Sequence, residues 1–198
     1  VNDIYLSLVD AASTTKITEA IMTKVDTISL YKINEAMPIN LSVKLYDKDL
    51  LLKEITTDII ITPMNESSHI LGNYEMLSCF VTPNASEVKE VITLANKILS
   101  EIRKTDTAFF GYQANDIDSV REEMMAIYNA LKSLDINYAN PPASFNLFQS
   151  VRLPKTVLRE KFGTCLDLAI LYCSCLEAVG LNPILLLVDG HAFAGCFL

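Results

Sequence analysis

The chain has 198 residues, of which 51% are apolar, and its formal net charge is −8. This apolar content excludes a disordered chain, and the longest apolar run is far shorter than the roughly 20 residues that span a bilayer. The acidic balance disfavours binding to a nucleic-acid backbone, which requires clustered Lys and Arg, so we expect a globular protein that contacts neither nucleic acid nor a membrane.

The first 75 or so residues are rich in β-branched residues and are expected to form strands. Segment 1–25 is compatible with a strand pair or a helix, and its periodicity favours neither. The polar stretch 64–75 is expected to be a loop or a domain boundary. The expected strands are 27–33, 39–47 and 54–63, with turns in "NEAMP" and "YDKD".

From residue 84 the apolar spacing changes to the threes and fours of amphipathic helices. One helix is expected to begin with Asn84 or Ser86 as its N-cap, and a second runs from about Asp116 to Leu134. The inward positions predicted for the first are Val88, Val91, Ile92, Ala95, Ile98, Leu99 and Ile102, and for the second Ile117, Val120, Met124, Ile127, Tyr128 and Leu131.

The C-terminal part is predicted to be two helices and a hairpin. Paired prolines make 136–145 a loop. A short helix over 153–163 starts at Pro154 and stops at Gly163, and a longer one over about 165–179 is capped by Thr164 and ended by Gly180. "PILLLVD" and "HAFAGCFL" then form a β-hairpin around Asp189–Gly190.

The five cysteines have no disulfide-like or zinc-like spacing, which favours a reducing compartment and no metal site. No phosphate-binding or dinucleotide-binding glycine motif is present, so we expect no cofactor. The start "VNDIYLSLVD" lacks the basic and apolar regions of a signal peptide. The missing initial Met is expected either from a piece of a longer protein or from processing. Cys79, Cys173, Cys175 and Cys196 are interpreted as structural.

Cys165 and His191 are the candidate functional pair. A helix over 165–179 is about 21–24 Å long, and the strand that follows returns over about 23 Å. If the strand packs antiparallel to the helix, His191 comes back level with the helix start, where Cys165 lies. Two interpretations stay open at this point: a nucleophile with its base, or a core thiol and an exposed imidazole.

The position of Cys165 is compatible with the first interpretation, and the residues alone do not decide between the two. Unpaired N–H groups and the helix dipole favour a thiolate in the first helical turn, and the same N–H groups suit the oxyanion of acyl transfer. Arg159 and Lys161 add local positive charge. Asp167 is expected to stabilise the helix N-terminus and not to act in catalysis.

The segment "GTCLDLAILYCSCLEAVGLNPILLLVDGHAFAGCFL" resembles the core of the transglutaminase-like (papain-like) superfamily of cysteine enzymes. Its G-x-C-x-D-x-A and G-H-A-F elements match the family's nucleophile and base, which implies catalytic roles for Cys165 and His191. More narrowly, "LSCFVTPN", "INYANPPASF" and "RLPKTVLREKFGTCLDLA" are similar to an N-terminal region of large bacterial proteins with superfamily 1 helicase segments downstream.

The resemblance implies an α+β chain with an immunoglobulin-like β-sandwich over 1–75 and a transglutaminase-like domain over 76–198. The C-terminal part of that domain's sheet would lie beyond Leu198. The Asp or Asn that orients the histidine would lie there too or be absent from the parent protein, and Gln113 or Asn140 would serve the oxyanion hole. Without that third residue, this piece of the chain would be inactive even if its parent is an enzyme.

The implied activity is that of a cysteine peptidase or acyltransferase in the cytoplasm, acting on a protein or peptide substrate. Its partners would be the helicase-like domains of the same polypeptide, and the open sheet edge invites an edge-strand dimer. The alternative is a non-enzymatic scaffold or recognition module with a vestigial Cys–His pair.

Overall fold

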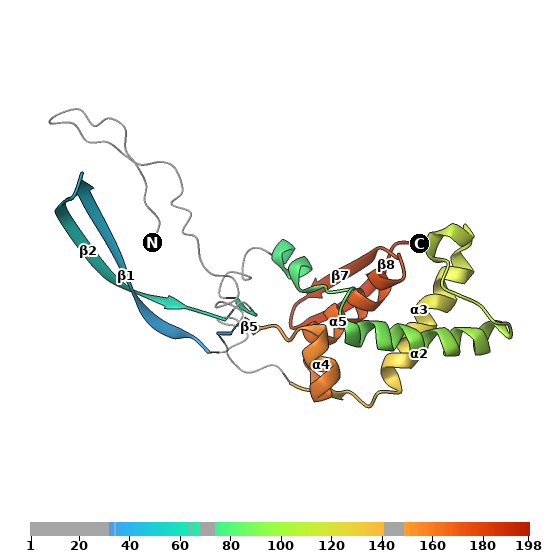
Figure 1. Cartoon of the computed structure of the whole chain (residues 1–198). Helices are drawn as coiled ribbons and strands as arrows, with labels where there is room; N and C mark the ends of the chain where they lie inside the picture. Colours follow the sequence, from blue (N-terminus) through green and yellow to red (C-terminus); the bar gives the residue numbers. More distant parts are fainter. Residues whose placement is uncertain (1–31, 34, 64, 68–73, 141–148) are drawn as a thin grey trace. The chain divides into compact units, whose positions relative to one another are not determined.

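The computed structural model describes residues 32, 33, 35–63, 65–67, 74–140 and 149–198. The chain divides into two compact units, Val1–Met64 and Asn65–Leu198. Figure 1 shows that the described residues combine helices and strands, in agreement with the α+β class. The expected elements within residues 1–25 and most of the predicted strand 27–33 lie outside the described residues, and residues 32 and 33 of that strand are not in a strand.

The described part of the first unit is one antiparallel hairpin of β1 (Met37–Asp47) and β2 (Leu50–Ile61). The strands expected at 39–47 and 54–63 are confirmed, although β2 begins earlier than predicted. The turn between them contains Lys48, whose φ of 52° lies in the left-handed region. The described residues of this unit form a single two-stranded sheet, so the sandwich stays a prediction.

Successive strand residues point to opposite faces, and near the middle of the hairpin one face is mainly polar and the other mainly apolar. On the polar face the Ser42 hydroxyl donates to Glu54 over 2.7 Å and Lys44 lies 3.3 Å from the same carboxylate. These two partners lower the pKa of Glu54, Ser42 contributing most. The opposite face carries exposed apolar side chains, namely Met37, Leu41, Val43, Leu45 and Ile55.

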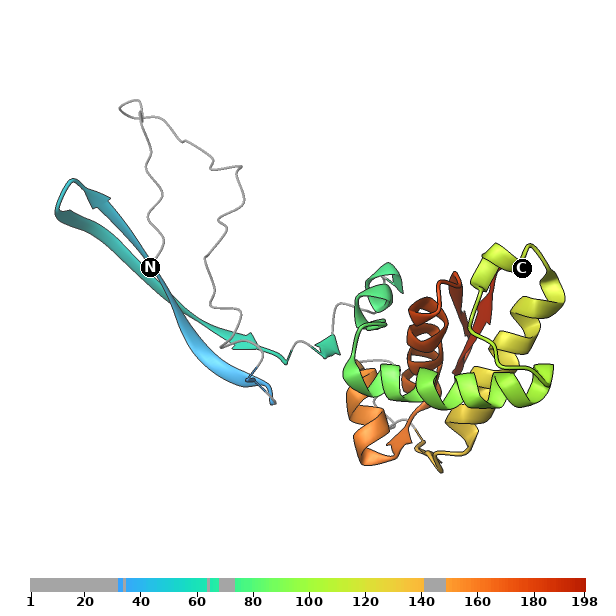
Figure 2. The same ribbon diagram turned by 45° about the vertical axis from the view of Figure 1, so that its right-hand side comes forward.

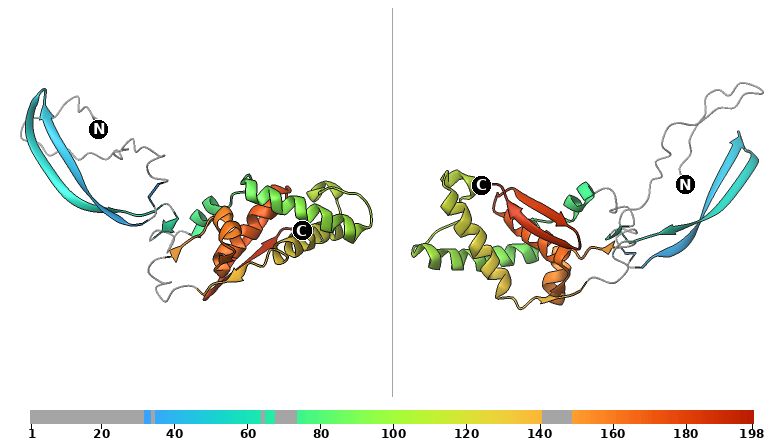
Figure 3. Two further views of the ribbon diagram at one scale, coloured as in Figure 1. Left: turned by 60° about the horizontal axis from the view of Figure 1, so that its bottom comes forward. Right: turned by 180° about the vertical axis from the view of Figure 1, so that it is seen from behind.

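The second unit is built around helix α5 (Cys165–Ala178). It contacts helices α2 (Ser86–Arg103), α3 (Ile117–Lys132) and α4 (Pro154–Glu160), and the strands β7 (Pro183–Val188) and β8 (His191–Cys196). Figure 2 shows α5 alongside the antiparallel β7–β8 hairpin. In the right-hand view of Figure 3 the hairpin lies over α5, so one face of this small sheet covers the helix.

Short elements occupy the segments that were expected to be loops. The antiparallel pair β3 (Glu66–Ser67) and β5 (Gln149–Ser150) and the 3-10 helix η1 (Tyr74–Phe80) lie partly in or beside the predicted loop 64–75. A second 3-10 helix, η2 (Gly111–Ala114), precedes α3. Within the predicted loop 136–145, β4 (Asn137–Tyr138) pairs in parallel with β6 (Phe162–Gly163).

The helix predictions are largely confirmed, with corrections at the ends. Asp116 caps α3 by accepting from the N–H groups of Asp118 and Ser119. The N-cap of α2 is Ala85, without a side-chain cap, so the prediction of Asn84 or Ser86 is wrong. Helix α4 ends before Lys161, whose φ of 60° terminates it ahead of the predicted Gly163.

The predicted inward faces are confirmed for α2 and only partly for α3. Val88, Val91, Ala95 and Leu99 of α2 are buried, and Ile92 and Ile98 pack against them. In α3, Val120 and Ile127 are buried, whereas Ile117 and Tyr128 are 51% and 58% exposed. The buried face of α3 contains Glu123 in their place.

No helix in the described part of the chain is long and apolar enough to cross a membrane.

Candidate thiol site at the start of α5

The N-terminus of α5 is fixed by a reciprocal capping box. The Thr164 hydroxyl accepts from the Asp167 N–H over 3.3 Å, and the Asp167 carboxylate accepts from the Thr164 N–H over 2.9 Å. Cys165 is the first residue of the helix, as predicted. Its thiol therefore lies at the positive end of the helix dipole.

Asp167 is fully buried and joins the capping box to the preceding chain. Its carboxylate accepts from the Arg152 backbone N–H over 2.8 Å and from the guanidinium over 3.2 Å. The same guanidinium lies 4.4 Å from the Phe162 ring centroid. The predicted role of Asp167 at the helix start is confirmed.

The cation bound at this helix start is Arg152 and not the two that the sequence suggested. Arg159 is largely exposed and pairs with Glu160 at 3.1 Å, and Lys161 is exposed. Arg152 was missed because it lies before α4 in sequence and reaches Asp167 only through the fold.

Cys165 and the start of β8 belong to one buried cluster. Cys165 is 4% exposed and Ala192 is 5% exposed, and both pack in the cluster that contains Leu77 and Val151. The beginning of α5 and the beginning of β8 therefore lie in one region of the fold, which is what the lengths of the helix and strand predict.

The His191 side chain lies on the other face of β8. Because strand side chains alternate, the buried Ala192 faces α5 while His191 and Phe193 face away from it. The rings of His191 and Phe193 stack with centroids 6.4 Å apart. Among the described residues no hydrogen bond joins Cys165 to His191. The fold brings their backbone segments together without placing the imidazole on the thiol.

A tyrosine that the sequence analysis did not select lies beside Cys165. Tyr138 of β4 is paired in register with Gly163, two residues before Cys165. Burial raises the pKa of the Tyr138 phenol, and the charge of the neighbouring Cys165 thiol raises it further. A tyrosine shortly before a glycine-cysteine element carries no recognisable local signal, since the contact depends on a pairing across 25 residues.

The structure separates the two oxyanion-hole candidates. Gln113 lies in η2, where Gly111 approaches the backbone of Val179 and Gly180 at the far end of α5. A helix of 14 residues spans about 21 Å, so Gln113 lies far from Cys165. Asn140 is near the site, because the N–H of the preceding Ala139 donates to the Gly163 carbonyl over 2.8 Å.

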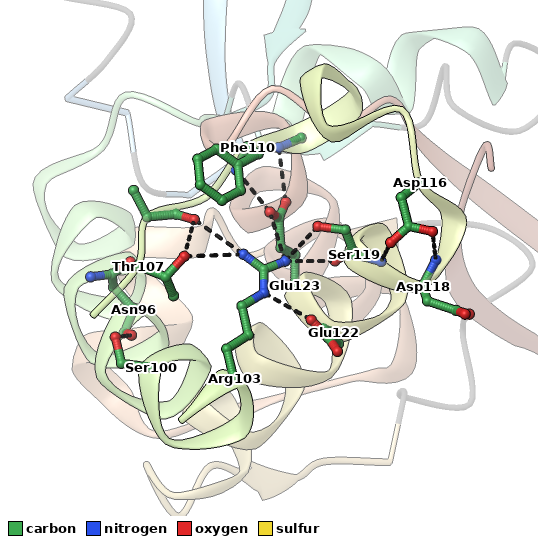
Figure 4. Close-up of polar contacts among 12 residues, drawn as sticks. Asn96, Ser100, Arg103, Thr107, Phe110, Asp116, Asp118, Ser119, Glu122 and Glu123 are labelled. Carbon is green, nitrogen blue, oxygen red and sulfur yellow. Dashed lines mark hydrogen bonds and ion pairs between the residues drawn. The ribbon is translucent and has the colours of Figure 1, made fainter. Parts of the chain in front are cut away.

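Figure 4 shows a second polar cluster, whose members include Arg103 of α2 and Glu123 of α3. The fully buried Glu123 accepts from the N–H groups of Phe110 and Gly111 over 2.7 and 3.0 Å. Arg103 lies 3.4 Å from Glu123 and 2.8 Å from Glu122, and also donates to Ser119. Each polar group is bound within the protein, so this cluster holds the segment between α2 and α3 in place.

The other thiols differ in exposure. Cys173 and Cys175 are buried in α5, and burial raises the pKa of Cys173 to about 11 and of Cys175 to about 12. Cys196 is partly buried, 3.4 Å from the Tyr112 hydroxyl. Cys79 is exposed and does not belong to the core. Within the described residues no group of three or more acidic, His or Cys side chains is arranged to hold a metal ion.

No protein-family model matches the chain, and comparisons with curated proteins and with solved structures give no match either.

Proposed function

We propose that the second unit carries a thiol-dependent site for acyl chemistry on amides, centred on Cys165. The observation that supports this most directly is the position of Cys165 as the first residue of a capped helix. The helix N-terminus favours a thiolate over a thiol and offers backbone N–H groups to an oxyanion. The start of β8, with His191, lies beside this position.

In the proposed reaction the Cys165 thiolate attacks the carbonyl carbon of a protein or peptide amide. The C–S bond forms, the C–N bond breaks, and the amine leaves with a proton donated by the His191 imidazolium. Water then hydrolyses the thioester, which releases the carboxylic acid and returns the thiol. Attack by an amine in place of water would make the same site an acyltransferase. The mechanism requires the imidazole to leave Phe193 and turn toward Cys165.

A second candidate function is a non-enzymatic scaffold or recognition module. Two observations favour it: Cys165 is only 4% exposed, and the His191 ring stacks on Phe193. In this alternative the thiol packs the core between α5 and β8, and no base acts on it.

The two candidates are separated by the rate of iodoacetamide alkylation at each cysteine as a function of pH, measured by mass spectrometry. For an activated thiol, Cys165 reacts with an apparent pKa well below the ordinary value of about 8.5, and His191→Ala raises that value. The exposed Cys79 is the internal reference. If Cys165 reacts no faster than Cys79, and His191→Ala does not change the pH dependence of its alkylation, the enzymatic proposal fails and the scaffold remains.

The resemblance supplies the finer parts of the proposal. We assign the second unit to a transglutaminase-like fold, because the unit has a helix with Cys at its start packed on an antiparallel hairpin with His at its start. A β-sandwich in the first unit is supported by the exposed apolar face of the β1–β2 hairpin. Five free thiols support a reducing compartment such as the cytoplasm. We also include in the proposal that the chain is attached to helicase-like domains of the same polypeptide.

A further inference from the structure

We propose that a cavity between helices α2 and α4 of the second unit binds a small zwitterion with an apolar body, of the class of the free aliphatic amino acids. The cavity has a volume of about 290 Å³, which lies at the lower end of the roughly 300–1,000 Å³ of small-molecule sites. The inference goes beyond the proposed function and does not depend on the thiol chemistry.

The floor of the cavity is apolar and comes from three parts of the unit. Val91 and Leu94 belong to α2, Leu158 belongs to α4, and Leu134 follows the end of α3. Val91 and Leu158 are 3% and 7% exposed, and the other two pack against the same core cluster. Because α2 contacts both α3 and α4 (Figure 2), the packing of the core holds this floor in place. Such a floor accommodates an aliphatic side chain.

The two sides of the cavity carry opposite charges. Glu87 and Glu90 of α2 line one side, and Arg159 of α4 and Lys161, the residue that ends this helix, line the other. Glu87 is half-buried, and the other three side chains are exposed to solvent. A molecule that lies on the floor therefore meets carboxylates on one side and cations on the other. This arrangement is complementary to an ammonium group and a carboxylate on one ligand.

The opposite charges do not pair with each other across the cavity. Among the described residues, no ion pair joins an acidic residue of α2 to a basic residue of α4. The Ser86 hydroxyl donates to Glu87 over 2.9 Å, and Arg159 pairs with Glu160 of its own helix at 3.1 Å. The pKa of Glu87 is lowered mainly by its own backbone N–H and by Ser86. The positive charges of Lys155 and Arg159 lower it further, so the two sides act on each other without closing the cavity.

The charge arrangement selects a zwitterion over a singly charged ligand. A carboxylate alone is attracted by Arg159 and Lys161 and repelled by Glu87 and Glu90, and an amine alone meets the reverse. A ligand with both groups is attracted on both sides, so discrimination comes from repulsion as well as attraction.

The test is a titration of the full chain with L-leucine at neutral pH and low salt, followed by ¹H–¹⁵N NMR spectra. Saturable shifts are expected at the amides of Val91, Leu94 and Leu158. Three related probes each lack one feature: N-acetyl-L-leucine the ammonium group, L-leucinamide the carboxylate, and glycine the aliphatic body. Each is expected to bind about three- to ten-fold more weakly than L-leucine.

Substitutions on the two sides test whether these charges bind the probe. Glu87→Gln and Arg159→Gln are each expected to weaken L-leucine binding by about three- to ten-fold, because each removes one charge partner. The matched controls are Glu101→Gln, in the last turn of α2, and Arg121→Gln, at a 63% exposed arginine of α3. Both controls are expected to leave the affinity unchanged.

Three results would overturn the inference. The first is the absence of any saturable shift with L-leucine. The second is a shift that saturates at the same L-leucine concentration in Glu87→Gln, Arg159→Gln and the wild type, which would place the contact elsewhere. The third is binding of N-acetyl-L-leucine or L-leucinamide as strong as that of L-leucine, which would show that the cavity does not recognise a zwitterion.

Discussion

Replacement of Glu123 by glutamine is expected to destabilise the second unit by about 2–4 kcal/mol, because it leaves a buried N–H group without an acceptor. The Glu123 carboxylate uses one oxygen for the Phe110 N–H and Arg103 and the other for the Gly111 N–H. A glutamine has one acceptor oxygen, so its NH₂ group must face one of these donors. An unsatisfied buried donor costs about 1–3 kcal/mol, and the lost negative charge beside Arg103 adds to this.

The assay is urea denaturation followed by far-UV circular dichroism, since every described α-helix lies in the second unit. Glu122→Gln is the matched control, because Glu122 pairs with the same Arg103 but is 38% exposed. Glu122→Gln should lower the free energy of unfolding by less than about 1 kcal/mol. If the two variants unfold at the same urea concentration, the buried acceptor does not carry the stability that we assign to it.

Two further predictions concern α5. Thr164→Ala should lower the free energy of unfolding by about 0.5–2 kcal/mol, because it removes the capping box. Ser86→Ala, at the start of α2 where no side chain caps the helix, should change the free energy of unfolding by less than about 0.5 kcal/mol. Equal effects of the two substitutions in urea denaturation would contradict the cap assignments. Stability should also fall as the pH rises from about 8.5, the ordinary pKa of a thiol, toward about 11. The reason is that the folded state keeps the Cys173 thiol protonated while the unfolded state ionises. The denaturation midpoint across this range should depend less steeply on pH in Cys173→Ala, and an unchanged slope would show that Cys173 titrates alike in both states.

Local chemical signals in the sequence predicted the helix boundaries that depend on them. Thr164 and Asp116 act as caps because their side chains reach N–H groups only two or three residues away. The same reasoning failed at Ser86, where the helix begins without a side-chain cap. A side chain able to cap does not do so in every helix, and tertiary packing decides between the alternatives.

The periodicity of α3 gave an incomplete account of its buried face. Hydrophobicity placed Ile117 and Tyr128 inward, but both are exposed, while the charged Glu123 is fully buried. Burial of this carboxylate depends on donors from Phe110 and Gly111, which a helical pattern does not contain. A buried charge of this kind becomes predictable only once its partners are placed.

The candidate site was partly accessible from sequence. The proximity of Cys165 to the start of β8 follows from the lengths of one helix and one strand. The direction of the His191 side chain does not follow from these lengths, because it depends on which face of β8 packs against α5. Tyr138 was missed because it reaches the site through a two-residue parallel pairing.

The β7–β8 hairpin is held unequally at its two ends. At one end the Tyr112 hydroxyl donates to the Phe197 carbonyl over 2.7 Å and accepts from the Asn182 N–H over 3.1 Å. The other end is the exposed turn at Asp189–Gly190, next to His191. Amide hydrogen exchange should therefore be fastest beside His191 and slowest toward Asn182 and Phe197. We therefore expect the hairpin to open first at the histidine, which would let the imidazole change direction while the strands toward Asn182 and Phe197 stay paired.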